Sequence, residues 1–424
     1  MSTVILKDRI VKNASFYGCM LLVIWVIFKD VFRVSLFFGL PDFAFFFFFL
    51  GLLVSFIALL QGLSKVKLSI FDLTVVMYIL YSSAVTLSHT IIYNPYSLTS
   101  YQVLVVLAFQ LVSMLLLWFY ALKDPDLLIG VTKLVAKYAL ICCVALASCL
   151  LVFVFVDLNL VFQFYSELLD LGVIVNPFQT SDDAIAVRFS GIFYSALNFG
   201  LFVVFCLIVV LGDNTNRHKG LVMFLVLVLL LLSSFNRNAM ITFGFSSMAI
   251  ILWRLGLQKV YVLMLMYLGL ALIVGILIFI VNMESSIDRS DSFVLSAHSL
   301  YSRLEIWGYW LGTLDFRSLI YGHGVIAGMG DDHLYIDNGY VFLVVNSGIV
   351  SLLFLVYQML HLAGKGAQLT SCGADVAFFL ILGLPVAMIF NNVVLDPMLM
   401  LLFFFYPMAL LNKAQIEEGN LVDG

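Results

Sequence analysis

The sequence predicts an all-α, polytopic integral membrane protein, and its composition and its apolar runs carry that prediction. Hydrophobic residues make up 63% of the 424 residues and charged residues only 11%, whereas an average soluble domain is about a quarter charged. Apolar stretches of roughly 20 residues, the length that crosses a bilayer as a helix, recur along the whole chain. About twelve such stretches fit this length. We therefore expect a single transmembrane domain over residues 1–424.

The interruptions between apolar stretches place the predicted spans in order. Lys29, Asp30 and Arg33 separate the first two, and Pro41 suits the first position of the second helix. The predicted spans cover residues 14–28, 42–62, 70–88, 101–122, 131–156, 190–211, 220–235, 238–255, 260–281, 336–360, 375–392 and 396–411. Two longer polar segments remain: a loop at 157–189 and a large loop at 282–335, between the ninth and tenth spans.

The distribution of Lys and Arg orients the chain, because cytoplasmic loops carry an excess of these residues. With a cytosolic N-terminus, 14 of the 21 basic residues fall on the inner side and 7 on the outer side, and Lys29 is the only outer lysine. We therefore expect both termini in the cytosol and both long loops outside. No small-residue cleavage site follows a short apolar core near the start, so we expect no removable signal peptide.

Several classes of function and site are disfavoured. The sequence has no Gly-x-x-x-x-Gly-Lys-Ser/Thr motif and no strand–Gly-rich–helix unit, so we expect neither ATP hydrolysis nor a cofactor. It has no basic stripe for nucleic acid. The six cysteines fall in apolar spans or in a segment placed in the cytosol, which predicts no disulfide or thiolate–metal framework. A metal at Asp331–His333 is disfavoured, because adjacent residues rarely all reach one ion.

The outer arginines are the first candidate site residues. Arg237 lies in SFNRNAM, in a turn with no room for a real loop, on the side where positive charge is disfavoured. Arg188 opens the sixth span, and Arg289 and Arg303 lie in the large loop. Guanidinium groups suit paired contacts with phosphate oxygens, so arginines converging from separate spans would bind a diphosphate. The alternatives are snorkelling at a helix end and, for Arg289, a solvated loop charge among acidic neighbours.

Three motifs occur in a fixed order: RFSGIFYSALNFG from Arg188 to Gly200, SFNRNAM around Arg237, and IDNGYVFLVVNSGIVSLL from Ile336. With the long outer loop before the last motif, this pattern resembles the O-antigen polymerase (Wzy-type) and O-antigen ligase superfamily of bacterial envelope glycan assembly, over most of the chain. The resemblance implies a GT-C-like fold and a glycosyltransferase facing the periplasm from the inner membrane. Its donor would be an oligosaccharide on undecaprenyl diphosphate, bound by Arg188, Arg237 and Arg303. A protein that regulates chain length is an implied partner, beside membrane lipid.

The start of the tenth span distinguishes the polymerase from the ligase. Ligases of this superfamily carry a His–Asn-type pair there, whereas this chain has Asp337–Asn338 and then Gly339–Tyr340. The difference favours a polymerase, whose acceptor is a second lipid-linked repeat unit, over a ligase, whose acceptor is lipid A–core. A flippase for lipid-linked oligosaccharide is a further alternative. Such carriers usually have charged or broken helices near the bilayer midplane, while the ionisable residues here cluster at span ends.

Glycosyl transfer also needs a group that accepts the proton of the attacking hydroxyl. The candidates are Asp337, His333 and Glu305, with His323 as a further possibility. For sugar contacts we consider Asn338, Tyr340, His323 and Arg289. His333 and His323 could equally be ordinary loop and turn residues. The motif FNNVVLDP at residues 390–397 could bind sugar hydroxyls or cap helices.

Overall fold

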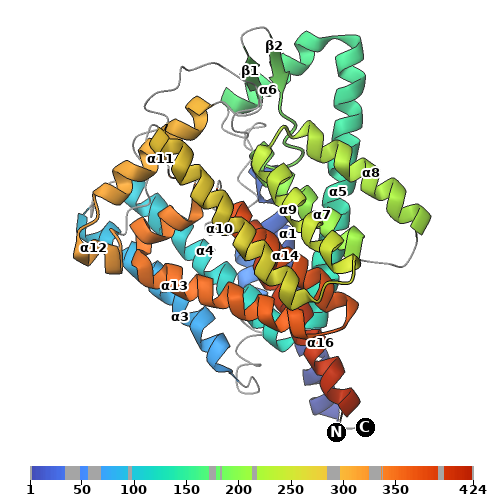
Figure 1. Cartoon of the computed structure of the whole chain (residues 1–424). Coiled ribbons are helices and arrows are strands. Elements are labelled where there is room, and N and C mark those ends of the chain that lie inside the picture. The colour runs from blue at the N-terminus through green and yellow to red at the C-terminus, as the bar shows by residue number, and fades with distance from the viewer. Residues whose placement is uncertain are drawn as a thin grey trace.

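The computed structural model describes residues 2–33, 48–55, 68–93, 98–170, 178–181, 184–212, 217–283, 297–323, 336, 338–389 and 396–422. In these residues the protein is a bundle of helices with one short β-hairpin (Figure 1). The hairpin pairs β1 (Phe178–Ser181) with antiparallel β2 (Ala184–Val187). The predicted helical membrane fold is therefore confirmed, and the hairpin is an addition to it.

Helices lie along the described parts of the predicted spans, with bounds that differ from the predicted ones by up to about a dozen residues. In the first half they are α1 (Ser2–Arg33), α3 (Ile70–Tyr93), α4 (Leu98–Lys123), α5 (Pro125–Val156), α6 (Leu158–Asp170) and α7 (Ala196–Gly212). In the second half they are α8 (Arg217–Ser233), α9 (Arg237–Arg254), α10 (Lys259–Met283), α11 (Ala297–Gly312), α12 (Phe316–Tyr321), α13 (Gly339–Gln368), α14 (Cys372–Ile389), α15 (Pro397–Met400), the π-helical turn η5 (Leu401–Phe405) and α16 (Tyr406–Val422). Residues 48–55, within the predicted second span, are also helical.

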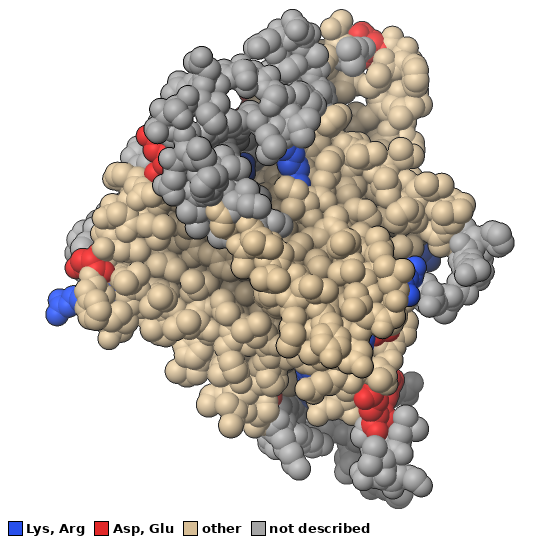
Figure 2. All heavy atoms as spheres, in the orientation of Figure 1, with Lys and Arg blue, Asp and Glu red and all other residues tan. Residues whose placement is uncertain are grey.

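Among the described residues, five helices are long and apolar enough to cross a membrane: Asn13–Val31, Pro125–Val156, Gly339–Gln368, Cys372–Ile389 and Pro397–Glu418. Shorter apolar helices accompany them at Ile70–Val85, Leu111–Lys123, Ala196–Gly212, Gly220–Ser233 and Lys259–Leu272. Figure 2 shows a broad face with almost no Lys, Arg, Asp or Glu, and these residues lie towards its margins. The molecule is thus a membrane-embedded helical protein, while the count of twelve spans stays a prediction.

The core lies around α14, which packs against α7, α9, α13 and α16. Large aromatic side chains fill it, among them Phe202, Phe378, Phe403 and Tyr406, each fully buried. Pro385 lies inside α14, where its missing N–H removes a helical hydrogen bond. The backbone carbonyl of Pro385 accepts a hydrogen bond from the hydroxyl of Tyr340 at 2.9 Å, which joins α13 to α14 at this point.

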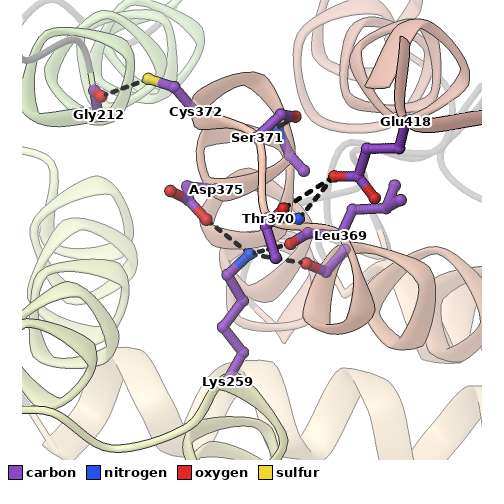
Figure 3. Close-up of polar contacts among 10 residues, drawn as sticks. Gly212, Lys259, Leu369, Thr370, Ser371, Cys372, Asp375 and Glu418 are labelled. Carbon is purple, nitrogen blue, oxygen red and sulfur yellow. Dashed lines mark hydrogen bonds and ion pairs between the residues drawn. The ribbon is translucent and has the colours of Figure 1, made fainter. Parts of the chain in front are cut away.

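One end of the bundle is tied together by Lys259 at the start of α10 (Figure 3). Its ammonium group pairs with Asp375 of α14 at 2.5 Å and donates to the carbonyl oxygens of Gly366 and Leu369, at 3.1 and 2.6 Å. These carbonyls belong to the last turn and C-cap of α13, where helical acceptors lack partners. These contacts join the start of α10, the end of α13 and the start of α14.

Other helix ends lie at this same end of the molecule. The thiol of Cys372 donates to the carbonyl of Gly212, at the end of α7 (Figure 3). Arg254, at the end of α9, donates to the carbonyl of Leu211. In Figure 1 the first turns of α1 and the last turns of α16 also lie together at the bottom of the view. The side of the membrane on which this end lies stays a prediction.

Both predicted outer loops contain secondary structure. The segment 157–189 holds the amphipathic helix α6 and the β-hairpin, and 282–335 holds α11 and α12. The sixth predicted span, 190–211, is too long at its start, because α7 begins only at Ala196. The residues before it form a tight turn in which Gly191 has a φ of 59°, a conformation that favours glycine.

Candidate functional site

Two arginines from separate helices, Arg237 and Arg303, lie near enough to Arg188 for their charges to act on it. Arg188 precedes α7, Arg237 is the first residue of α9, and Arg303 lies in α11. Burial lowers the pKa of the half-buried Arg188 below its ordinary value, and the positive charges of Arg237 and Arg303 lower it further. Arginine nevertheless stays protonated at neutral pH. The structure thus brings together the three residues that the sequence predicted as a diphosphate site, although they lie far apart in the sequence.

The segment that carries Arg188 is fixed at several points. The N–H of Phe189 donates to the carbonyl of Ser233 at 3.0 Å, which joins this segment to the turn before Arg237. The N–H of Tyr194 donates to the carboxylate of Asp30 at 2.8 Å. A Cβ at Gly191 would lie 2.8 Å from the sulfur of Cys143, so the backbone of the turn packs closely against α5. These contacts restrain the backbone on both sides of Arg188.

The turn between α8 and α9 presents Arg237. Phe235 adopts a φ of 46°, which is uncommon for a bulky residue and marks a constrained turn. Ser234 is fully buried, and its hydroxyl donates to Leu231 at 2.6 Å. Asn236 caps α9 by accepting from the N–H of Ala239 at 2.9 Å. Arg237 itself is exposed at the positive end of the helix dipole, where an anion is stabilised.

A close approach of two helices holds α9 beside the Arg188 segment. A Cβ built on Gly200 of α7 would lie 2.7 Å from the Cβ of Ala239 in α9. Asn238 is buried, and its side-chain amide donates to the carbonyl of Ala387 near the end of α14 at 3.0 Å. The polar residues of SFNRNAM other than Arg237 therefore brace helix ends, and Arg237 is the exposed one.

Arg303 is placed by the packing of α11 against α13. Trp307 of α11 is buried in a small apolar cluster with Ile336, Phe342 and Val345, which lie at the start of α13 and just before it. Arg303, one turn before Trp307, is half-buried, whereas Glu305 is exposed. Side chains two positions apart do not face each other on a helix, which accounts for their different surroundings. A catalytic role for Glu305 stays a prediction.

Asn338 and Tyr340 hold the ends of two helices together. The side-chain oxygen of Asn338 caps α13 by accepting from the N–H groups of Tyr340 and Val341, both at 2.9 Å. Its amide donates to the carbonyl of Ile389, the last residue of α14, at 2.8 Å. With the hydroxyl of Tyr340 bonded to Pro385, both predicted sugar contacts have structural roles. A contact with sugar stays a prediction for each of them.

His323 lies two residues after the end of α12. Its N–H donates to the carbonyl of Val345 at 2.6 Å, and its ring Nε2 lies 3.3 Å from the carbonyl of Thr313. A contact of His323 with sugar stays a prediction. The remaining predicted site residues, Asp337, His333 and Arg289, lie outside the described residues, as does the Asp331–His333 motif.

The sequence missed a half-buried polar cluster formed by Lys29, Asn198 and Asp396. Asp396 pairs with Lys29 of α1 at 3.2 Å and accepts from the amide of Asn198 in α7 at 2.6 Å. It also caps α15 by accepting from the N–H of Met398 at 2.8 Å. The capping interpretation of FNNVVLDP is thereby confirmed for Asp396. The signal was present in the sequence as charged residues at positions 29 and 30, inside an apolar stretch.

The described residues contain no group of three or more His, Cys, Asp or Glu side chains that could hold a metal ion. No protein-family model matches the chain, and no curated protein sequence matches it either.

Proposed function

We propose that the protein is a membrane glycosyltransferase that polymerises undecaprenyl-diphosphate-linked oligosaccharide units into O-antigen or a related surface polysaccharide. The observation that carries this proposal is that Arg237 and Arg303, from separate helices, lie near enough to Arg188 for their charges to act on it. The three motifs that resemble the O-antigen polymerase and ligase superfamily add the class of substrate. On this proposal the site faces the periplasm from the inner membrane, and a chain-length regulator is a partner.

The arginine cluster suits a ligand with two phosphate groups. Several guanidinium groups in one region attract anions, and the oxygens of a diphosphate can contact more than one of them, which a single carboxylate cannot do as readily. Arg188 and Arg303 are each half-buried, and charge pairing is stronger in such surroundings than in water. Arginine can contact phosphate oxygens in pairs, which also fixes the orientation of the group.

In glycosyl transfer, the bond between the anomeric carbon and the diphosphate oxygen breaks, and a sugar hydroxyl of the acceptor forms the new bond. Negative charge then grows on the leaving diphosphate. Guanidinium groups already in position stabilise this charge in the transition state. The proton of the attacking hydroxyl goes to a general base, for which Asp337, His333 and Glu305 are the candidates.

A gene deletion tests the proposed function. A polymerase deletion leaves surface lipid A–core capped by a single repeat unit, seen as one band just above free core on a lipopolysaccharide gel. Loss of every repeat unit would instead indicate a ligase or a flippase, and an unchanged ladder would contradict all three. If the product is a capsule, the corresponding result is the loss of long polymer with lipid-linked single units retained.

Complementation of the deletion then tests the arginine site. We expect Arg237→Ala to abolish chain extension while the protein still inserts at the parent level. The matched control is Arg317→Ala, which removes an exposed arginine in α12. We expect this control to restore the ladder. A full ladder with Arg237→Ala would remove Arg237 from the site.

A further inference from the structure

The end of α5 is apolar and exposed on every side. All residues from Leu151 to Val156 are exposed hydrophobic side chains, with Phe155 82% and Val156 74% exposed. A helix that is hydrophobic all round must be surrounded by other apolar material, either a protein core or lipid. The structure leaves these residues uncovered, and hydrocarbon is the apolar medium available to a membrane protein.

The length of the uncharged part of α5 supports a lipid environment. Lys133 and Lys137 are exposed on its first half, and Asp157 follows its last residue. Between Lys137 and Asp157, the stretch Tyr138–Val156 has no charged residue, and at 1.5 Å per residue it is about 28 Å long. This matches a hydrocarbon core of about 30 Å. Asp157 therefore marks the level at which α5 leaves the hydrocarbon.

α6 begins immediately after this boundary and is amphipathic. Asn159, Gln163 and Glu167 follow one another at intervals of four residues, so they share one face of the helix, and all three are exposed. Val161 and Tyr165 lie on the opposite face and are buried. With 13 residues, α6 is too short to cross the bilayer.

The buried strip of α6 has exposed apolar residues beside it. Leu160 is 47% exposed and Phe164 44% exposed, and both lie between the buried strip and the polar face. In Figure 1, α6 lies with the β-hairpin at the top of the view, next to the upper end of α5. The exposed apolar side chains thus continue from the end of α5 onto one flank of α6.

We propose that α6 is a membrane-surface helix whose Leu160 and Phe164 insert into phospholipid at the boundary marked by Asp157. Its polar face then points to the aqueous side. A short amphipathic helix that follows directly from a lipid-embedded segment has the geometry of an interfacial helix. Because α6 contains Glu167 and Asp170 but no Lys or Arg, its attachment rests on apolar burial and not on attraction to anionic headgroups. The helix anchors the segment that leads through the hairpin to Arg188.

Site-directed spin labelling of the full chain tests this placement. In a background with the exposed Cys142, Cys149 and Cys372 replaced by alanine, single cysteines are introduced by Leu160→Cys and Phe164→Cys. Gln163→Cys and Glu167→Cys are the matched controls on the polar face, and Val152→Cys on α5 is the lipid reference. The labelled proteins are reconstituted into phosphatidylcholine vesicles, and accessibility to oxygen and to a water-soluble nickel chelate is measured.

We expect the ratio of oxygen to nickel accessibility at positions 160 and 164 to resemble that at position 152 and to exceed the ratio at 163 and 167 several-fold. The values should not change when phosphatidylglycerol replaces part of the phosphatidylcholine. Equal nickel accessibility at all four α6 positions would overturn the proposal. Protection from both reagents at 160 and 164 would also overturn it, because a protein surface would then cover this flank. The experiment needs no substrate, so its outcome is independent of the proposed function.

Discussion

The carboxylate of Asp30 accepts a hydrogen bond from the backbone N–H of Tyr194 at 2.8 Å. This contact joins the end of the first helix to the segment that carries Arg188, more than 150 residues later in the chain. Asp30 is only 4% exposed, and a buried carboxylate is retained only where hydrogen bonds or charges compensate for its lost hydration. Asp30, which interrupts the first apolar stretch of the sequence, therefore helps to hold the segment that carries Arg188.

Replacement of Asp30 tests this support. Asp30→Ala leaves the N–H of Tyr194 without its acceptor, and an unsatisfied buried donor costs about 1–3 kcal/mol. Asp30→Asn keeps an oxygen acceptor, so we expect it to lie between the parent and the alanine variant. Thermal unfolding in detergent measures the difference. Identical unfolding temperatures for all three proteins would show that the bond does not hold the segment.

Asn338 provides a second test of how the helix ends are held. Asn338→Ala removes both the cap of α13 and the hydrogen bond to Ile389, whereas Asn338→Asp keeps the capping oxygen and loses only the amide donor. Loss of an N-cap alone costs about 0.5–2 kcal/mol. The expected order of unfolding temperature is parent, then aspartate, then alanine. An alanine variant as stable as the aspartate variant would mean that the cap contributes nothing.

Two glycines of α13 form a matched pair for a packing test. Gly348 has a φ of 75°, and a Cβ there would overlap the carbonyl of Ile320 in α12. Gly348→Ala should therefore displace α12 and lower the unfolding temperature strongly. Gly364 has nothing within 4 Å of a built Cβ, and an alanine there should raise stability by about 0.5–1 kcal/mol. If both variants behave alike, α12 does not pack on α13 as described.

The general base is tested by three separate substitutions. Asp337→Asn, His333→Gln and Glu305→Gln each remove one candidate proton acceptor with little change in size. General acid–base catalysis typically contributes about 10²–10⁴-fold, so the variant that lacks the base should lose activity by such a factor. Rates of chain extension by the purified variants are the measurement. An Asp337→Asn variant as fast as the parent would exclude Asp337.

The spans were predictable because long apolar stretches and charged interruptions report membrane helices directly. α6 could also have been found, since LNLVFQFYSELLD repeats with helical periodicity, but it was treated as part of a loop. The β-hairpin and the late start of α7 were not predictable in this way. The start of α7 depends on a contact between distant residues, Asp30 with Tyr194, that no local pattern contains. The hairpin pairs neighbouring residues, but they lie in a segment that was treated as a loop.

The residues of the candidate site likewise fall into those that the sequence could predict and those whose roles depend on distant contacts. Arg188, Arg237 and Arg303 were predicted because guanidinium groups on the outer side of a membrane protein are unusual. The additional roles of Asn338 and Tyr340 could not be predicted, because their partners lie on α14 and follow from packing. Lys29 and Asp396 were seen only as an interruption and a helix cap, since their pairing spans most of the chain.

Chain extension by the purified protein is the most direct test of the central claim. The protein is reconstituted into liposomes with undecaprenyl-diphosphate-linked repeat units, and the length of the glycan is measured by gel and mass spectrometry. The parent and Arg317→Ala should produce a ladder of repeat units, and Arg237→Ala should leave single units. A parent protein that inserts correctly and leaves its own organism's lipid-linked units unextended would contradict the account.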